Sequence, residues 1–150
     1  MQERIRVAVK ESGTLAEVRD NILTLFKYMV EEEGVTQIGY VAAIITSDGE
    51  EKVGENIARL QRYTEHVRKT QNYPVFSATD VFTEELYERL FAAGFKNDDW
   101  IVFWREVLGK DFVTDIFMTP RWEQSTGASD EYQTAKRTGK NLHYFNYEIE

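Results

Sequence analysis

The sequence predicts a single α/β domain, residues 1–150, built on a mainly parallel sheet with helices on both faces. Segments with the pattern of strands alternate with segments with the pattern of helices along the chain. That order is typical of parallel strands joined by helical crossovers. Residues 36–45 are mostly apolar, as expected of a central strand buried on both faces. A length of 150 residues suits one domain with one core.

The first 34 residues are predicted to add a strand and a helix to this pattern. Apolar and polar residues alternate over 5–9, which predicts a short strand. Thr14 and Glu17 have the spacing of a capping box. An apolar stripe at helical spacing follows them, and Gly34 is expected to end that helix.

The rest of the chain continues the alternation of strands and helices. Apolar residues three or four apart mark the helices, and glycines follow several of them. The predicted helices lie at 50–70, 83–93, 98–108 and 128–138, and the predicted strands at 73–77, 111–119 and 141–149. The charged stretch 59–69 is expected to be a solvated helix face. In such a fold, ligands bind outside the carboxyl ends of the strands, here near loops 46–49 and 119–127.

Composition narrows the function classes. The absence of Cys excludes disulfides, thiolate metal sites and thiol catalysis. The two histidines, His66 and His143, have no neighbouring ligands in sequence, so neither a metal nor a cofactor is expected. A net charge of −8 disfavours a nucleic acid polymer but is compatible with one phosphorylated small molecule. Without a long apolar run or a signal-peptide pattern, we expect a cytoplasmic protein with no membrane partner.

The loop 120–127 and the helix after it have two interpretations. Ser125, Thr126 and Gly127 could cradle an anion at the helix N-terminus, or a hydroxyl there could simply cap the helix. Glu131, expected near the helix start, could be a surface group stabilised by the helix dipole or a carboxylate aimed at the ligand crevice. Trp122 could stack on a nucleobase or anchor the loop.

The stretch from Ser125 to Lys140 resembles the signature helix of the nucleoside 2-deoxyribosyltransferase superfamily. In that family a catalytic Glu opens a helix, with an Ala four residues on and a Gly-Lys or similar pair eight and nine residues on. Glu131, Ala135, Gly139 and Lys140 match this pattern. Ser125, six residues before the Glu, resembles the Ser that holds the phosphate in members acting on nucleoside 5′-monophosphates.

Weaker matches extend the resemblance over roughly residues 37–147. Asp115 stands where the family has an Asp at the start of the preceding strand. Tyr40 aligns with the Tyr of a family strand that ends Tyr-x-Ala-Gly-Pro-Ile. The alignment departs at Ala43 and Ile44, which replace the family's Gly and Pro.

The resemblance implies a flavodoxin-like, doubly wound, mainly parallel sheet of about five strands, with the N-terminal strand and helix as an extension. It implies cleavage or transfer at the N-glycosidic bond of a nucleoside 5′-monophosphate. Glu131 is the nucleophile in this scheme. Asp99, preferred to Asp98, is a candidate proton donor to the departing base. Tyr40 either packs near the sugar or orients Glu131, unless it is only a core tyrosine. Family members often form homodimers, so a homodimer is expected.

Two rival hypotheses remain open. One is a non-catalytic nucleotide-binding or sensing domain on the same fold, favoured by the departures at Ala43 and Ile44. The other is an interaction protein in which Glu131 is only a surface group. A glutamate pointing into bulk solvent would favour the latter, whereas a glutamate lining a pocket with Ser125 and Tyr40 would favour the nucleotide hypotheses.

Overall fold

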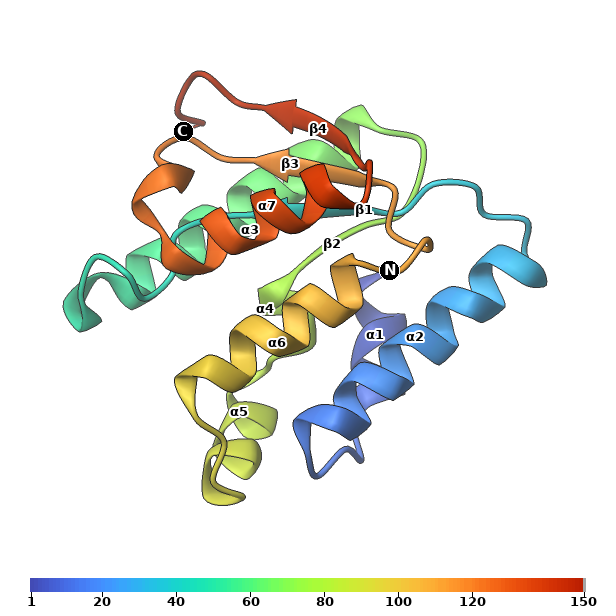
Figure 1. The fold of residues 1–150 in the computed structure, drawn as a ribbon, viewed down its shortest axis with the longest axis horizontal. Helices are drawn as coiled ribbons and strands as arrows, with labels where there is room; N and C mark the ends of the chain where they lie inside the picture. The colour runs from blue at the N-terminus through green and yellow to red at the C-terminus, as the bar shows by residue number, and fades with distance from the viewer. Residues whose placement is uncertain (150) are drawn as a thin grey trace.

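Four parallel strands form the central sheet, in the spatial order β2-β1-β3-β4 (Figure 1). The computed structural model describes residues 1–149, apart from the side chain of Asn97. The strands are β1 (Gly39–Ala42), β2 (Val75–Ser77), β3 (Asp115–Met118) and β4 (Asn141–Tyr144). The prediction of a parallel α/β sheet is confirmed, but the sheet has four strands where about five were expected.

Helices occupy most of the remaining chain. Within residues 1–149 the α-helices are α1 (Gln2–Val9), α2 (Leu15–Glu31), α3 (Val53–Thr70), α4 (Ala78–Val81), α5 (Glu84–Ala92), α6 (Asn97–Leu108) and α7 (Thr126–Arg137). The 3₁₀-helices are η1 (Glu50–Lys52) and η2 (Trp122–Gln124). The helices predicted over 50–70, 83–93, 98–108 and 128–138 therefore exist, with ends shifted by a few residues. The short helix α4 was not predicted.

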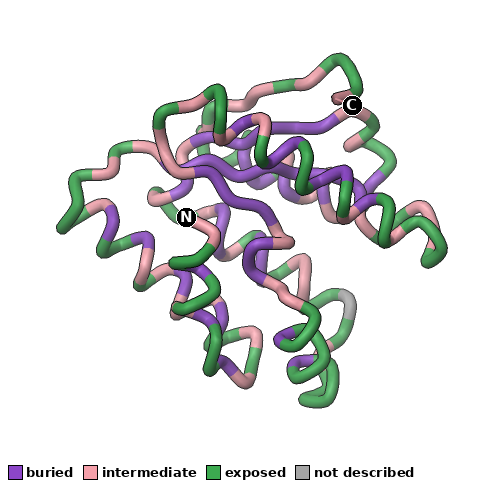
Figure 2. Tube along the Cα trace, turned by 180° about the vertical axis from the view of Figure 1, so that it is seen from behind, coloured by how far each residue is buried: buried purple, intermediate pink, exposed green. Residues whose placement is uncertain are grey.

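The sheet is covered on both faces. Helix α3, which connects β1 to β2, packs on one face, while α6 and α7 cover the other together with α1 and α2. Every residue of β1 and β3 is buried, which confirms a central strand within 36–45, although it is only four residues long. Figure 2 shows the same concentration of buried residues along the middle of the sheet.

The chain reverses its direction of travel across the sheet between β1 and β3, which makes this pair of strands the switch point of the fold. From β1 it moves outward to β2, then returns past β1 to β3 and continues outward to β4. The connections that leave these two adjacent strands therefore go to opposite faces. In open α/β sheets, a crevice for ligands forms at the carboxyl ends of two such strands.

The predicted strand over 5–9 is wrong, because these residues form helix α1. Ile5 and Val9 are fully buried, whereas Val7 between them is 67% exposed. Positions four apart lie on the same face of a helix, so one buried face satisfies this pattern. Five residues cannot distinguish alternation in a strand from the two ends of a helical stripe. This difference accounts for the missing fifth strand.

The predicted helix after residue 14 is confirmed as α2. The Thr14 side chain caps it by accepting a hydrogen bond from the Glu17 backbone N–H at 3.1 Å. Gly34, with φ of 72°, follows the helix in the left-handed conformation that glycine adopts without strain. Ile5 of α1 and Phe26 of α2 belong to the same buried cluster as the β1 residue Tyr40, so residues 1–34 contribute directly to the core.

The predicted strand over 141–149 ends at Tyr144. The following residues, 145–149, which we name the returning segment, run back over α3. The ring of Phe145 meets Tyr63 of α3 edge-on, with centroids 5.0 Å apart. The Tyr63 hydroxyl donates to the Tyr147 carbonyl at 2.9 Å and accepts from the Ile149 N–H at 3.1 Å. The returning segment therefore lies beside α3 instead of extending β4.

Candidate functional site

Two loops meet at the carboxyl ends of β1 and β3, where the fold predicts a ligand crevice. Thr119, just after β3, donates its hydroxyl to the Ala42 carbonyl at 2.8 Å and holds the two strand ends together. Ser47 in the loop after β1 accepts a hydrogen bond at 3.1 Å from the backbone N–H of Thr126, the first residue of α7. Asn56 of α3 fixes the same loop through the Ile45 carbonyl. The two loops are thus joined to each other and to α3 by specific hydrogen bonds.

Tyr40 and Glu131 form a buried pair on the α7 side of the sheet. The Tyr40 hydroxyl donates to Glu131 Oε1 at 2.9 Å, and the glutamate is only 7% exposed. The Tyr40 ring contacts Phe76 of β2 and Trp104 of α6, with centroids 5.1 and 4.9 Å away. The tyrosine is therefore held rigidly by aromatic neighbours while its hydroxyl orients the carboxyl group of Glu131.

Helix α7 begins two residues earlier than predicted, which changes the position of Glu131. Because the helix starts at Thr126, Glu131 lies in its second turn instead of at its start. The helix dipole acts mainly within the first turn, so it does little to keep this carboxylate ionised. The interpretation of Glu131 as a dipole-stabilised surface group is wrong, since the side chain points into the core.

Burial raises the pKa of Glu131 to about 8, with a smaller contribution from neighbouring Asp130, while the hydrogen bond from Tyr40 opposes the rise. Burial and the adjacent carboxyl group also raise the pKa of Tyr40 well above its ordinary value, so it remains a hydroxyl donor. At neutral pH Glu131 is thus mostly protonated, and it ionises readily when positive charge develops beside it. Titratable groups perturbed in this way are concentrated at functional sites.

Ser125 caps helix α7. Its hydroxyl accepts a hydrogen bond from the Ala128 N–H at 3.1 Å, and the residue is buried. Together with the bond between Ser47 and Thr126, this satisfies two of the N–H groups that begin the helix. A Cβ added to Gly127 would approach the Ser125 hydroxyl to 3.9 Å, an ordinary contact, so packing does not require glycine there.

Trp122 anchors its loop. Its ring stacks on Tyr132 of α7, with centroids 4.4 Å apart and planes inclined by 28°. Of the predicted site residues, the structure therefore places Ser125, Gly127, Glu131 and Trp122 along one helix and the loop before it. It joins Tyr40 to Glu131 directly.

Asp99 and Asp115 lie elsewhere. The Asp99 carboxylate accepts a hydrogen bond from the Lys96 N–H at the start of α6. It lines a cavity of about 390 Å³ whose other walls come from α2, α5 and α6, and neither Tyr40 nor Glu131 borders this cavity. Neighbouring Asp98 is exposed. Asp115 is buried at the amino end of β3, bonded to His143, Thr114 and Gln37. The structure thus brings none of these aspartates to Glu131.

The two departures from the family pattern also have defined positions. Ala43 packs in the buried cluster on the α3 face, with Val41 and Leu60. Its methyl group therefore lies on the opposite face of the sheet from Glu131. Ile44 is buried as well.

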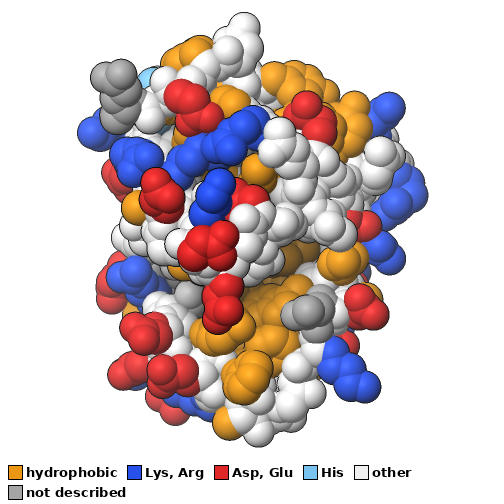
Figure 3. All heavy atoms as spheres, turned by 90° about the vertical axis from the view of Figure 1, so that its left-hand side faces the viewer, with side chains coloured by type: hydrophobic (Ala, Val, Ile, Leu, Met, Phe, Trp, Pro, Cys, Tyr) orange, Lys and Arg blue, Asp and Glu red, His pale blue; other side chains and the backbone are white. Residues whose placement is uncertain are grey.

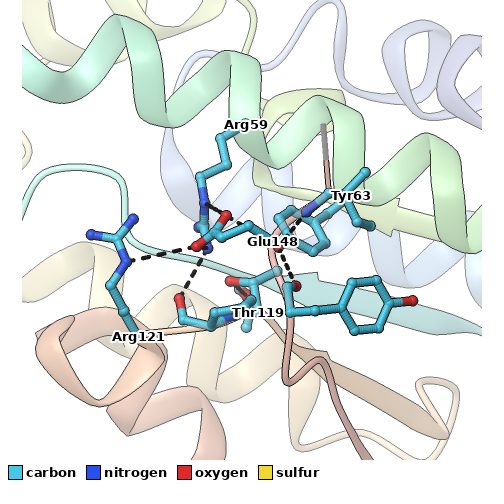
Figure 4. A network of polar contacts seen from close by, with 9 residues as sticks. Arg59, Tyr63, Thr119, Arg121 and Glu148 are labelled. Carbon is cyan, nitrogen blue, oxygen red and sulfur yellow. Dashed lines mark hydrogen bonds and ion pairs between the residues drawn. The ribbon is translucent and has the colours of Figure 1, made fainter.

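Sequence reasoning missed a polar cluster around Arg59. This residue belongs to the stretch expected to be solvated, yet it is only 6% exposed, so that expectation is wrong for Arg59. It binds both carboxylate oxygens of Glu148 and the Pro120 carbonyl (Figure 4). Asn56, Arg59 and Tyr63 share one helix face at spacings of three and four residues. That spacing was the one sign in the sequence that Arg59 faces the fold.

Aromatic side chains connect the buried pair to the surface. Exposed Tyr87 of α5 stacks on Trp100 of α6 at 5.9 Å, and Trp100 meets Phe82 edge-on at 4.5 Å. Phe82 contacts Trp104, which contacts Tyr40. In Figure 3, hydrophobic side chains line a hollow in the lower half of this side of the molecule, whereas charged side chains gather above it. Such rings offer apolar faces suited to a planar ligand.

Three further observations concern metal binding, membrane spans and related proteins. Within residues 1–149, side chains of the kind that bind metals do not gather in groups of three or more. In the same part of the chain, no helix combines the length and apolarity needed to cross a membrane. Comparisons with protein-family models, with curated proteins and with solved structures yield no match.

Proposed function

We propose that the protein cleaves or transfers the N-glycosidic bond of a nucleoside 5′-monophosphate, with Glu131 as the nucleophile. The observation that supports this most strongly is the buried hydrogen bond of 2.9 Å between the Tyr40 hydroxyl and Glu131 Oε1. It orients one carboxyl group in an apolar setting beside the switch point of the sheet. The resemblance of residues 125–140 to the deoxyribosyltransferase signature supplies the substrate class.

The chemistry follows from the charge that builds up on the sugar. As the bond from C1′ to the base nitrogen breaks, its electron pair leaves with the base, and C1′ gains oxocarbenium character. A Glu131 carboxylate at C1′ stabilises that charge and captures it as a glycosyl ester. The base takes a proton from solvent. Attack on the ester by water gives a hydrolase, and attack by a second base gives a transferase.

The raised pKa of Glu131 determines the expected pH dependence. Only the ionised carboxylate can attack C1′, and its pKa of about 8 means that most molecules carry the neutral form at pH 7. Turnover should therefore increase with pH up to about 8 and then level off. The developing positive charge on the sugar favours ionisation of Glu131 within the complex.

The test is chromatographic detection of free base released from a panel of ribo- and deoxyribonucleoside 5′-monophosphates. Glu131→Gln should lower turnover by roughly 10³-fold or more, because the amide keeps the shape but cannot attack C1′. Glu123→Gln is the matched control, since it makes the same substitution at an exposed position in the loop before α7 and should leave turnover unchanged. Equal release by wild type and Glu131→Gln would contradict the proposal.

A second candidate is a nucleotide-binding domain without catalysis. The observation that favours it is the combination of a mostly neutral Glu131 with the replacement of the family's Pro by Ile44. Binding of nucleoside 5′-monophosphates without base release, even with an added acceptor base, would select this candidate. Absence of both binding and release would remove both candidates. Under either candidate function, we expect a small-molecule nucleotide as the partner, a homodimer and a cytoplasmic location.

A further inference from the structure

Two arginines and a tyrosine converge on the carboxylate of Glu148 in the returning segment (Figure 4). Arg59 donates from Nε to Oε2 and from Nη2 to Oε1, both at 3.0 Å. The Arg121 guanidinium lies 3.8 Å from Oε1, and the Tyr63 hydroxyl lies 3.3 Å from Oε2. This parallel fork from one guanidinium is the geometry with which arginine binds carboxylates and phosphates.

The two sides of this contact differ in how firmly the fold holds them. The Arg59 guanidinium is buried, bonds the Pro120 carbonyl at 3.0 Å and lies over the Tyr63 ring, 5.0 Å from its centroid. The Glu148 side chain is 52% exposed. The cationic side is thus built into the domain, whereas the anion reaches it from solvent. Glu148 is therefore the exchangeable side of the pair, because its carboxylate can turn into solvent whereas the Arg59 guanidinium is held in place.

The position of the cluster suits a ligand. Pro120 and Arg121 lie in the loop after the carboxyl end of β3, so the guanidinium groups lie near the switch point where open α/β sheets bind ligands. Arg121 has a φ of 67°, a left-handed conformation uncommon for residues other than glycine. Two arginines together also stand out in a chain with a net charge of −8.

We propose that Arg59 and Arg121 form a binding site for a phosphate monoester, which Glu148 fills as an internal substitute when that ligand is absent. A phosphate dianion carries more charge and more acceptor oxygens than a carboxylate, so it can displace Glu148. The site contains neither Tyr40 nor Glu131 and goes beyond the proposed function.

Hydrogen bonds from Arg59 hold the pKa of Glu148 below its ordinary value, so the carboxylate competes with phosphate at neutral pH. Glu148→Gln removes that charge and frees the half-exposed side chain to turn into solvent. The Tyr63 hydroxyl still donates to the Tyr147 carbonyl and accepts from the Ile149 N–H, so the rest of the returning segment stays in place. The variant therefore isolates the effect of the carboxylate.

The experiment is calorimetric titration of the full chain with inorganic phosphate. We expect Glu148→Gln to bind phosphate roughly fivefold tighter than wild type, since the competing ion pair is exposed on one side. Adding Arg121→Gln to Glu148→Gln should reverse most of this gain. Glu123→Gln, which removes an exposed negative charge near Arg121, controls for the general change in charge and should bind like wild type.

Equal phosphate affinity of wild type and Glu148→Gln would overturn the proposal, as would unchanged affinity on adding Arg121→Gln. Glu131→Gln should leave phosphate binding unaffected, so this result is independent of the glycosidase proposal. Titration of Glu148→Gln with a nucleoside and its 5′-monophosphate identifies the source of the phosphate. Tighter binding of the monophosphate than of inorganic phosphate indicates a nucleotide, and equal binding indicates free phosphate.

Discussion

Two buried carboxyl groups on opposite faces of the sheet differ sharply in how the fold treats them. Asp115, at the amino end of β3, accepts hydrogen bonds from Thr114, His143 and Gln37. Burial acts to raise its pKa, but those bonds outweigh burial and hold the pKa below its ordinary value. Glu131 has one donor, Tyr40, and its pKa rises to about 8.

The comparison separates a structural carboxylate from a candidate reactive one. A buried charge is tolerated where enough donors replace water, and it neutralises where they do not. The hydrogen bonds to Asp115 satisfy its carboxylate and therefore stabilise the ionised form of this residue. Glu131 has too few hydrogen-bond donors for a buried carboxylate, so its ionisation lowers the stability of the fold. Such a cost is expected of a group that is kept for function instead of folding. Four substitutions can break or sharpen this distinction.

The largest effect is expected from Glu131→Gln on the pH dependence of stability. The pKa of Glu131 in the folded state, about 8, exceeds the ordinary 4.5. The stabilising contribution of the neutral Glu131 carboxyl group is thus complete below pH 4.5 and is lost as pH rises through 8. The 3.5-unit difference corresponds to on the order of 5 kcal/mol in the free energy of unfolding. Urea unfolding at pH 5, 7 and 9 should show wild type weakening relative to the variant. If the free energies of unfolding of wild type and Glu131→Gln change in parallel with pH, the pKa of Glu131 is not raised.

Asp115→Asn should act in the opposite direction. Because the pKa of Asp115 is lowered by folding, its carboxylate stabilises the protein above its ordinary pKa, and this contribution disappears as pH falls through the folded-state value. At pH 7 we expect a loss of about 1–3 kcal/mol from the broken charge-assisted bonds. Urea unfolding at pH 7 and pH 3 measures it, and exposed Asp98→Asn is the control. If the difference in free energy of unfolding between wild type and Asp115→Asn is larger at pH 3 than at pH 7, the pKa of Asp115 is not lowered by folding.

Tyr40→Phe should raise the pKa of Glu131 further, because the lost hydroxyl is the donor that lowers it. The stability cost is about 1 kcal/mol, typical of one buried hydrogen bond. Carbon NMR of the Glu131 carboxyl group during a pH titration reads the change without any need for turnover. If the midpoint stays where it is in wild type, Tyr40 does not orient or tune the carboxyl group.

The smallest effect is expected from Ala43→Gly, which restores the residue found in the deoxyribosyltransferase pattern. Ala43 packs on the α3 face, away from Glu131. Loss of its methyl group should cost about 1 kcal/mol of stability. The Glu131 titration and any base release should stay as in wild type. A gain in turnover would show that this position influences the site across the sheet.

Much of the fold was predictable because its helices carry strong local patterns. The capping pair Thr14 and Glu17, together with the stripe after it, located α2, and the apolar run at 36–45 located the central strand. The failures were short segments. The helix α1 was taken for a strand because five residues contain too little periodicity, and β4 was extended too far because its apolar pattern continues into the returning segment.

The candidate site was predictable in part, and for a definable reason. Glu131 was identified through the resemblance of its helix and Tyr40 through a separate, imperfect alignment of a strand, and the fold brings them within hydrogen-bond distance although 91 positions separate them. Asp99 was chosen by its place on a helix, which says nothing about the direction of its side chain. Arg59 and Glu148 form a pair that depends on where the chain turns after β4, which no local pattern specifies.

The helices of residues 1–34 have a consequence for how the domain can be divided. Fully buried side chains from α1 and α2 pack in the cluster that holds the Tyr40 ring. A shortened chain that begins after Gly34 would therefore expose one wall of that core to water. As an evolutionary or engineering module, the Tyr40 and Glu131 pair can be transplanted only together with those two helices, because they complete the core in which the Tyr40 ring is packed.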